Sequence, residues 1–149
     1  MDNLNLPAFE PKIREQNGLI FIFDPIRKKW VKNTPEEWVR QHFVNYLVKY
    51  KLYPMSHIAN ESSITVGKVK KRCDTVIYDT NGCPKLIVEY KAPTVKITGD
   101  VFAQISRYNV ALKVDYLIVS NGMNHYCVKV DYETGGYVFL NDIPDYNSI

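Results

Sequence analysis

Two short apolar runs joined by a turn constrain the fold of this chain more than any other feature. Residues 75–78 read Thr-Val-Ile-Tyr and residues 86–90 read Leu-Ile-Val-Glu-Tyr, with Asp-Thr-Asn-Gly at 79–82 between them. An Asn-Gly pair between two β-prone runs is a strong hairpin signal. The pattern therefore predicts two neighbouring antiparallel strands, which bring Asp74, just before the first run, towards Glu89 near the end of the second.

Charged side chains gather at this end of the predicted hairpin. Glu89 and Lys91 lie on one side of their strand, because side chains in a strand alternate with a period of two residues. Together with Asp74 they place two carboxylates and an ammonium at the edge of a sheet, which suits a hard-cation site for phosphodiester cleavage. A simpler interpretation stays open, in which Glu89 and Lys91 are an ion pair and Asp74 only starts a strand.

The spacing of these residues resembles a known nuclease signature. Asp74 followed by Glu89-x-Lys91 is similar to the core motif of the PD-(D/E)xK nuclease superfamily, although Cys73 stands where that motif has proline. Two further motifs extend the likeness, Thr-Pro-Glu-Glu-x-x-Arg-Gln at residues 34–41 and Gln-x-x-x-Tyr at residues 104–108. Over residues 19–122 the chain thus resembles the N-terminal nuclease domain of the motor (R) subunit of type I restriction enzymes.

The resemblance implies a metal site. Mg²⁺, or Mn²⁺ as a substitute, is expected on Asp74, Glu89 and a backbone carbonyl near Tyr90. Glu36 is expected to act on the metal directly or through water, with Glu37 as the second choice for that role. Acidic residues in a first helical turn are also favoured by the helix dipole and by capping, so a structural role for this glutamate stays open.

Other residues are expected to assist the reaction or hold the substrate. Lys91 would orient or help to deprotonate the attacking water and stabilise charge on the phosphorane. A second group is expected to support the site or bind DNA: Gln104, Tyr108, Lys70, Lys71, Arg72 and Arg40. Ordinary solvated or core roles remain the alternative for these residues.

The pattern along the chain predicts an α/β fold. Thr34 as N-cap, Pro35 at the first helical position and Glu37 as the partner in a capping box start a helix that Tyr53-Pro54 stops. Its sheet-facing side is expected to carry Val39, Phe43, Tyr46, Leu47 and Tyr50. Strands are expected within residues 57–66, 72–78, 85–90, 115–120 and 125–130, with a second helix from 98 to about 112 and an edge strand or short helix at 137–140.

This order predicts a mixed central β-sheet flanked by helices. It is the α-β-β-β-α-β order of a restriction-endonuclease-like core, preceded by an N-terminal extension with a β-ribbon at residues 19–23 and 29–32. We expect residues 1–17 to form an extended arm or loop, residues 18–149 to form a single nuclease-like domain, and residues 144–149 to be loose.

Composition narrows the class of protein. The chain has 149 residues, 46% hydrophobic and 23% charged, with a net charge of +3. These values are ordinary for one globular domain. No apolar run is long enough to span a bilayer, so a cytoplasmic protein without a membrane partner is expected. Three cysteines without C-x-x-C spacing predict reduced, mostly buried thiols.

We expect a metal-dependent DNA endonuclease domain whose partners are DNA and, by resemblance, a helicase motor or other restriction-system subunits. The chain carries no P-loop and cannot itself be the motor. One alternative is a nuclease-fold module without catalysis that binds DNA or a protein partner. Another is an interaction or small-molecule-binding domain unrelated to nucleic acid.

Overall fold

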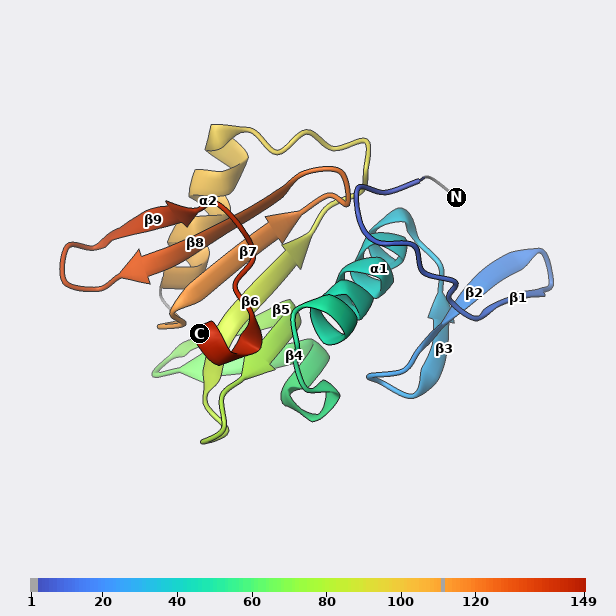
Figure 1. Ribbon diagram of the computed structural model, residues 1–149, viewed down its shortest axis with the longest axis horizontal. Coiled ribbons are helices and arrows are strands. Elements are labelled where there is room, and N and C mark those ends of the chain that lie inside the picture. The colour runs from blue at the N-terminus through green and yellow to red at the C-terminus, as the bar shows by residue number, and fades with distance from the viewer. Residues whose placement is uncertain (1–2, 111) are drawn as a thin grey trace.

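The computed structural model describes residues 3–110 and 112–149, with the side chains of residues 107–111 outside the described part, and it contains two β-sheets and two α-helices (Figure 1). The larger sheet has six strands in the order β4-β5-β6-β7-β8-β9. It is mixed, because β6 and β7 pair in parallel and the other neighbours are antiparallel. These strands are β4 (Ile58–Val66), β5 (Val69–Tyr78), β6 (Pro84–Tyr90), β7 (Tyr116–Ser120), β8 (His125–Asp131) and β9 (Gly136–Leu140).

A three-stranded antiparallel sheet stands apart from this body, beyond α1 and on the side away from β9 (Figure 1). Its strands are β1 (Ile13–Gln16), β2 (Leu19–Asp24) and β3 (Lys29–Lys32). The ribbon predicted at residues 19–23 and 29–32 is therefore present. The expectation of an arm or loop through residue 17 is wrong at residues 13–16, which pair with β2.

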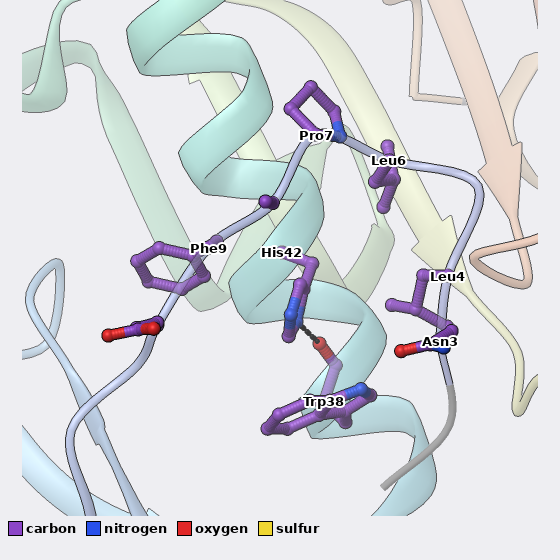
Figure 2. Close-up of a pocket in the computed structure, with 9 residues that line it drawn as sticks. Asn3, Leu4, Leu6, Pro7, Phe9, Trp38 and His42 are labelled. Atoms are coloured by element: carbon purple, nitrogen blue, oxygen red, sulfur yellow. Dashed lines mark hydrogen bonds between the residues drawn. The ribbon is translucent and has the colours of Figure 1, made fainter.

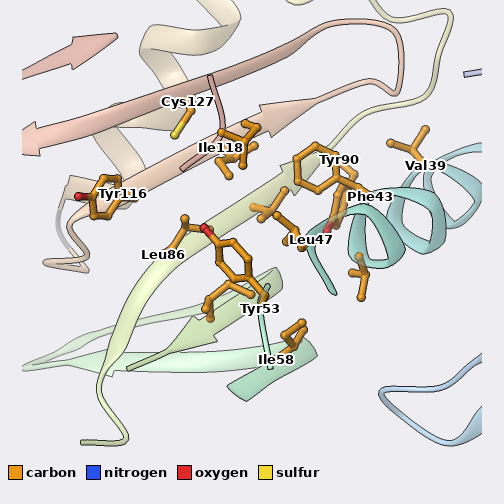
Figure 3. Packing of buried hydrophobic residues seen from close by; sticks show 14 residues of the cluster. Val39, Phe43, Leu47, Tyr53, Ile58, Leu86, Tyr90, Tyr116, Ile118 and Cys127 are labelled. Carbon is orange, nitrogen blue, oxygen red and sulfur yellow. The ribbon is translucent and has the colours of Figure 1, made fainter. Parts of the chain in front are cut away.

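The two helices cover opposite faces of the larger sheet. Helix α1 (Pro35–Tyr50) packs Val39, Phe43 and Leu47 into a core with alternate residues of β5, β6 and β7 (Figure 3). Helix α2 (Gly99–Val110) places Phe102 in a second core with the intervening residues of the same strands. A strand buried on both faces reads as a continuous apolar run, which explains residues 86–88. The predicted mixed sheet with flanking helices is thus observed.

The start of α1 follows the predicted capping in part. The Thr34 hydroxyl accepts a hydrogen bond from the Glu37 backbone N–H at 3.1 Å, and Pro35 follows as the first helical residue. The reciprocal half of the capping box is absent, because the Thr34 N–H donates to the Lys32 carbonyl instead. The Glu37 carboxylate is consequently available for the interior of the molecule. Of the residues predicted to face the sheet, Tyr50 is 57% exposed.

The C-terminal segment is anchored, contrary to the prediction that it is loose. Two short 3-10 helices, η1 (Met55–His57) and η2 (Tyr146–Ser148), lie beside each other. The Tyr146 ring packs edge-on against Tyr53 at 5.4 Å, and its hydroxyl donates to the Tyr78 carbonyl. An aromatic side chain that contributes both apolar area and a hydrogen bond can fix a terminus in this way.

A buried network of charged and polar groups connects the small sheet, α1 and the large sheet. Asp24, which is fully buried, accepts hydrogen bonds from Arg27 and from Asn60 of β4. Burial raises the pKa of Asp24, but these hydrogen bonds outweigh it and hold the pKa below its usual value. Arg27 also donates to Glu37 of α1 at 2.7 Å. The ribbon is therefore attached by hydrogen bonds whose loss leaves buried charge unpaired.

The network continues along α1 to the central strands. Arg40 donates to Glu37 at 3.0 Å, to Glu61 of β4 at 2.6 Å, and to the backbone carbonyl of Asp74 in β5 at 2.6 Å. Glu61 has a positive φ of 55°, a conformation that non-glycine residues rarely adopt. Its side chain also pairs with Arg72. Arg40 thus fixes the position of α1 over the start of the predicted site.

Two arginines share Glu61 and provide a matched test of this network. The Arg40 side chain is 8% exposed and the Arg72 side chain 69% exposed. We expect Arg40→Met to lower the free energy of unfolding by about 3–5 kcal/mol, because it leaves buried carboxylates unpaired. Arg72→Met is expected to cost less than about 1 kcal/mol. Urea denaturation of both variants measures the difference, and equal losses would contradict the assigned role of the network.

Candidate functional site

Asp74 and Glu89 lie opposite each other where β5 and β6 separate. The backbone pairing of these strands runs to Thr75 opposite Val88. One step further, the Tyr90 backbone N–H donates to the Asp74 carboxylate at 2.9 Å. A side chain thus takes the place of a backbone acceptor and holds the Asp74 carboxylate against the neighbouring strand. We call Asp74 and Glu89 the carboxylate pair.

The two carboxylates of the pair are partly buried and repel each other, which makes ionisation of Asp74 unfavourable. Burial raises the pKa of Asp74 to about 6, with a further increase from the charge and hydrogen bond of Glu89. The Tyr90 N–H and the Arg40 guanidinium act in the opposite direction but do not outweigh these effects. Two carboxylates sharing one site cannot both ionise without cost, and cations or a proton must balance them.

A lysine contacts the pair, and it is Lys71. Its ammonium donates to Glu89 at 2.7 Å, from β5 across to β6. The ion pair between Glu89 and Lys91 that was left open as an alternative is therefore formed by Lys71 instead. Lys91 is half-buried and follows the last residue of β6, and its backbone N–H donates to the Ser120 carbonyl of β7. Sequence spacing could not identify the cation that pairs with Glu89, because Lys71 belongs to the neighbouring strand, 18 residues earlier in the chain.

At the start of α1 the structure buries Glu37 rather than Glu36. Glu36, the first choice for a role at the metal, is exposed. Glu37 is 6% exposed and reaches Arg40, which in turn holds the Asp74 carbonyl. The reason is angular: Glu37, Arg40 and Gln41 form the i, i+3, i+4 set on one side of the helix, and Gln41 donates to Glu37 at 2.9 Å.

The residues predicted to support the site or bind DNA divide into two groups. Arg40 is buried and positions the backbone of Asp74, so its guanidinium faces the protein. Lys70 and Arg72 are exposed on β5, and Gln104 is exposed on α2. Tyr108 lies in α2, but its side chain is outside the described residues.

The donor set fits a hard cation with few protein ligands. Among the described residues, no group of three or more His, Cys, Asp or Glu side chains is arranged to hold a metal. The carboxylate pair offers two oxygen-bearing ligands in a partly buried place with surplus negative charge. Mg²⁺ is held in proteins by one or two carboxylates and keeps several waters, so the pair meets its requirements. Zinc, which prefers nitrogen and sulfur ligands, does not match it.

A pocket of about 370 Å³ lies elsewhere, between the N-terminal segment and α1 (Figure 2). His42 and Trp38 line it, and the His42 Nδ1–H donates to the Trp38 carbonyl at 2.8 Å. Burial lowers the pKa of His42, which keeps the ring neutral. The pocket shares no residue with the carboxylate pair.

Other predictions from composition can be compared with the structure. Cys73 and Cys127 are buried, Cys83 is exposed, and all three are free thiols, which confirms the prediction of reduced, mostly buried cysteines. Among the described residues, no helix is both long and apolar enough to cross a membrane.

Comparisons with known proteins place the geometry in context. The family model for the type I restriction enzyme R protein N terminus (HSDR_N) matches residues 35–144. Among solved structures, a fragment described as an HsdR subunit of a type I restriction enzyme from Vibrio vulnificus YJ016 is similar, with a TM-score of 0.47 and 22% identity. The similarity covers 68% of this chain and 22% of that one, about a fifth of its length. No curated protein matches the chain.

The strain in the carboxylate pair predicts a pH-dependent gain in stability. The folded pKa of Asp74, about 6, exceeds the unfolded value of about 3.9, so the folded state binds the proton more tightly. Its contribution to stability is complete below pH ~4 and is lost as the pH rises through about 6. Without divalent metal, Asp74→Asn should nearly match the wild type at pH 4 and be more stable by about 3 kcal/mol at pH 8.

Thermal denaturation with a chelator at both pH values measures this difference. Asparagine keeps an oxygen that can accept from the Tyr90 N–H, so the substitution removes charge rather than the hydrogen bond. Glu133→Gln, at an exposed carboxylate between β8 and β9, serves as the control and should show no such gain. A loss of stability in Asp74→Asn that is equal at both pH values would show that the pair is not strained.

Proposed function

Because this chain belongs to the family of type I restriction enzyme R protein N termini, we propose that it is a metal-dependent DNA endonuclease domain that hydrolyses phosphodiester bonds at the carboxylate pair. The observation that carries the proposal is the placement of Asp74 and Glu89 side by side where β5 and β6 separate. We further propose that the fold is the restriction-endonuclease-like core of the PD-(D/E)xK superfamily. It also places the protein in the cytoplasm, with DNA as its substrate.

Asp74 and Glu89 would hold Mg²⁺, or Mn²⁺ in its place, together with a backbone carbonyl near Tyr90 and water. When bound, the ion supplies Lewis-acid stabilisation of the phosphate and a more acidic water. The protein keeps Asp74 ready for this role. Its backbone is fixed by Arg40 on one side and its carboxylate by the Tyr90 N–H on the other, so the ligand does not have to be ordered on binding.

Two lysines supply positive charge from different strands. Lys71 neutralises Glu89 through a 2.7 Å ion pair. Lys91 follows the end of β6, two residues beyond Glu89, and would orient the attacking water and stabilise charge on the phosphorane. Lys70, Arg72 and Gln104 are exposed and would meet the DNA backbone.

Glu36 and Glu37 differ in what they can contribute. Glu36 is exposed and would reach a metal only through water. Glu37 acts through Arg40, which it holds by a hydrogen bond of 3.0 Å, and is therefore a positioning residue for Asp74.

A second candidate function is a nuclease-fold module that binds DNA or a protein partner without cleaving. The ion pair between Lys71 and Glu89 favours it, because a carboxylate already neutralised by lysine has less need of a metal. The chain spans about a fifth of the similar restriction-enzyme chain, so a helicase motor or other subunits acting with it are part of the proposal.

Metal binding and cleavage should both depend on the carboxylate pair. We expect Mn²⁺ to bind the wild type in calorimetric titration and to raise its stability by about 2.7 kcal/mol at a hundred times its Kd. Asp74→Asn combined with Glu89→Gln should remove the binding, and metal-dependent DNA cleavage should fall by at least about a hundredfold. Asp100→Asn, at an exposed carboxylate of α2, is the control. Normal cleavage by the double variant would refute the site, and a folded wild type that binds no Mn²⁺ would favour the non-catalytic module.

Lys91 should affect turnover but not metal affinity. Lys91→Met removes the ammonium and keeps the aliphatic chain, so cleavage is expected to fall by about a hundredfold while Mn²⁺ binding stays unchanged. Lys96→Met, at an exposed position in the following loop, should cleave normally. Cleavage assays and calorimetry on the two variants separate the roles, and full activity in Lys91→Met would remove it from the mechanism.

A further inference from the structure

The three-stranded sheet has an outer face on which cations and aromatic rings alternate. In the register of β1, β2 and β3, Arg14 and Lys32 are both opposite Phe21, and Phe23 is opposite Trp30. These side chains share one face because directly paired residues project to the same side. The other face carries Ile22 and Asp24, both 0% exposed, against the rest of the protein. We call the side with Phe21, Phe23 and Trp30 the outer face of the ribbon.

The cations of the outer face lack acidic partners. Lys12, Arg14 and Lys32 are exposed, and no ion pair in the described part of the chain involves any of them. The nearby Glu15 is opposite Ile20 in the register and therefore projects from the other face. Three cations without acidic partners give this small face a surplus positive potential, which an anionic partner would relieve.

The aromatic rings of the outer face are half-buried and carry cations as their present neighbours. Phe23 and Trp30 contact each other with centroids 5.4 Å apart. The Arg14 guanidinium is 4.5 Å from the Trp30 ring centroid, and the Lys12 ammonium is 5.6 Å from that of Phe23. A planar base can take such a place on a ring while the displaced cation moves to a phosphate.

We propose that the outer face of the ribbon binds single-stranded DNA, with bases stacked on Trp30 and Phe21 and phosphates on Arg14, Lys32 and Lys12. Aromatic platforms interleaved with cations are the chemistry that single strands require. A duplex presents phosphates and the groove edges of its bases but keeps the base faces stacked within the helix, so it would gain little from the aromatic rings. The alternation of aromatic rings and cations on this face therefore favours binding of a single strand over a duplex.

The inference rests on the proposed function for its choice of DNA as the polymer, and it adds a substrate feature to that function. The ribbon lies before residue 35, where the family match begins, so it is an addition to the matched region. Its orientation is fixed relative to the carboxylate pair. Asp24 is hydrogen-bonded to Asn60, and Asn60 accepts from Thr75, the residue next to Asp74.

Fluorescence anisotropy tests the proposal on the full chain, with a chelator present and an end-labelled oligo-dT of about ten nucleotides as the probe. We expect Arg14→Gln combined with Lys32→Gln to weaken binding by at least about tenfold. The slope of log affinity against log salt should fall by about 0.7 for each cation removed. Lys96→Gln combined with Lys129→Gln removes the same charge from exposed positions outside the ribbon and should leave both quantities near the wild-type values.

Tryptophan fluorescence tests the stacking directly. The chain has two tryptophans, Trp30 and Trp38, so Trp38→Phe leaves Trp30 as the only indole. Oligo-dT should quench its emission, and a duplex of equal length should quench it far less. Trp30→Leu should weaken oligo-dT binding by about tenfold without changing the salt slope. Equal binding of duplex and single strand, or equal losses in the ribbon and control variants, would overturn the proposal.

Failure of this inference can be distinguished from failure of the proposed function. The variant with Asp74→Asn and Glu89→Gln should bind oligo-dT like the wild type in the chelator, because the carboxylate pair does not take part in that binding. If the wild type binds through the ribbon but cleaves nothing with metal, only the nuclease proposal falls. If it cleaves with metal and the ribbon variants bind normally, only the ribbon proposal falls.

Discussion

The hydrogen bond from Arg40 to the backbone carbonyl of Asp74, 2.6 Å long, is the contact on which the arrangement of this molecule depends. It joins α1 to the central sheet at the position where β5 and β6 separate. The same guanidinium holds Glu37 and Glu61, which connect it to the small sheet through Arg27 and to the edge of the large sheet. A buried arginine is tolerated only when its donors are satisfied. Glu37 and Glu61 therefore fix the position of Arg40, and Arg40 in turn fixes the backbone of Asp74.

At the carboxylate pair, negative charge exceeds positive charge. Around Arg40 the positive and negative charges are matched, whereas burial and proximity raise the pKa of Asp74 to about 6 next to Glu89. Lys71 compensates Glu89, whereas the Asp74 carboxylate accepts its hydrogen bond from the Tyr90 backbone N–H. The charge-balanced network around Arg40 thus lies next to two carboxylates that a bound cation would stabilise. Perturbed carboxyl groups in such a setting are characteristic of functional sites.

The fold was largely predictable because its signals are local. The hairpin turn at residues 79–82, the cap at Thr34 and the apolar runs each determine structure over a few residues, and the observed elements follow them. What sequence reasoning missed depends on partners distant in the chain. Glu37 turns inward because Arg27 and Arg40 meet it there, and the lysine beside Glu89 comes from β5. The i, i+3, i+4 spacing of Glu37, Arg40 and Gln41 was a signal that could have identified the buried glutamate.

The position of the ribbon follows from the same network rather than from apolar packing alone. A three-stranded sheet that buries only part of one face needs an anchor, and Asp24 provides it by reaching Arg27 and Asn60 without exposure to solvent. Because the anchor uses the inner face, the outer face can carry unpaired cations and rings at no cost to the core. The register assigns Arg14 and Lys32 to one side and Glu15 to the other, and the Lys12 ammonium lies over the ring of Phe23 on the side of Arg14. This separation of charge across two faces concentrates positive potential where a polyanion can approach, and the buried hydrogen bonds keep that surface at a fixed orientation to the carboxylate pair.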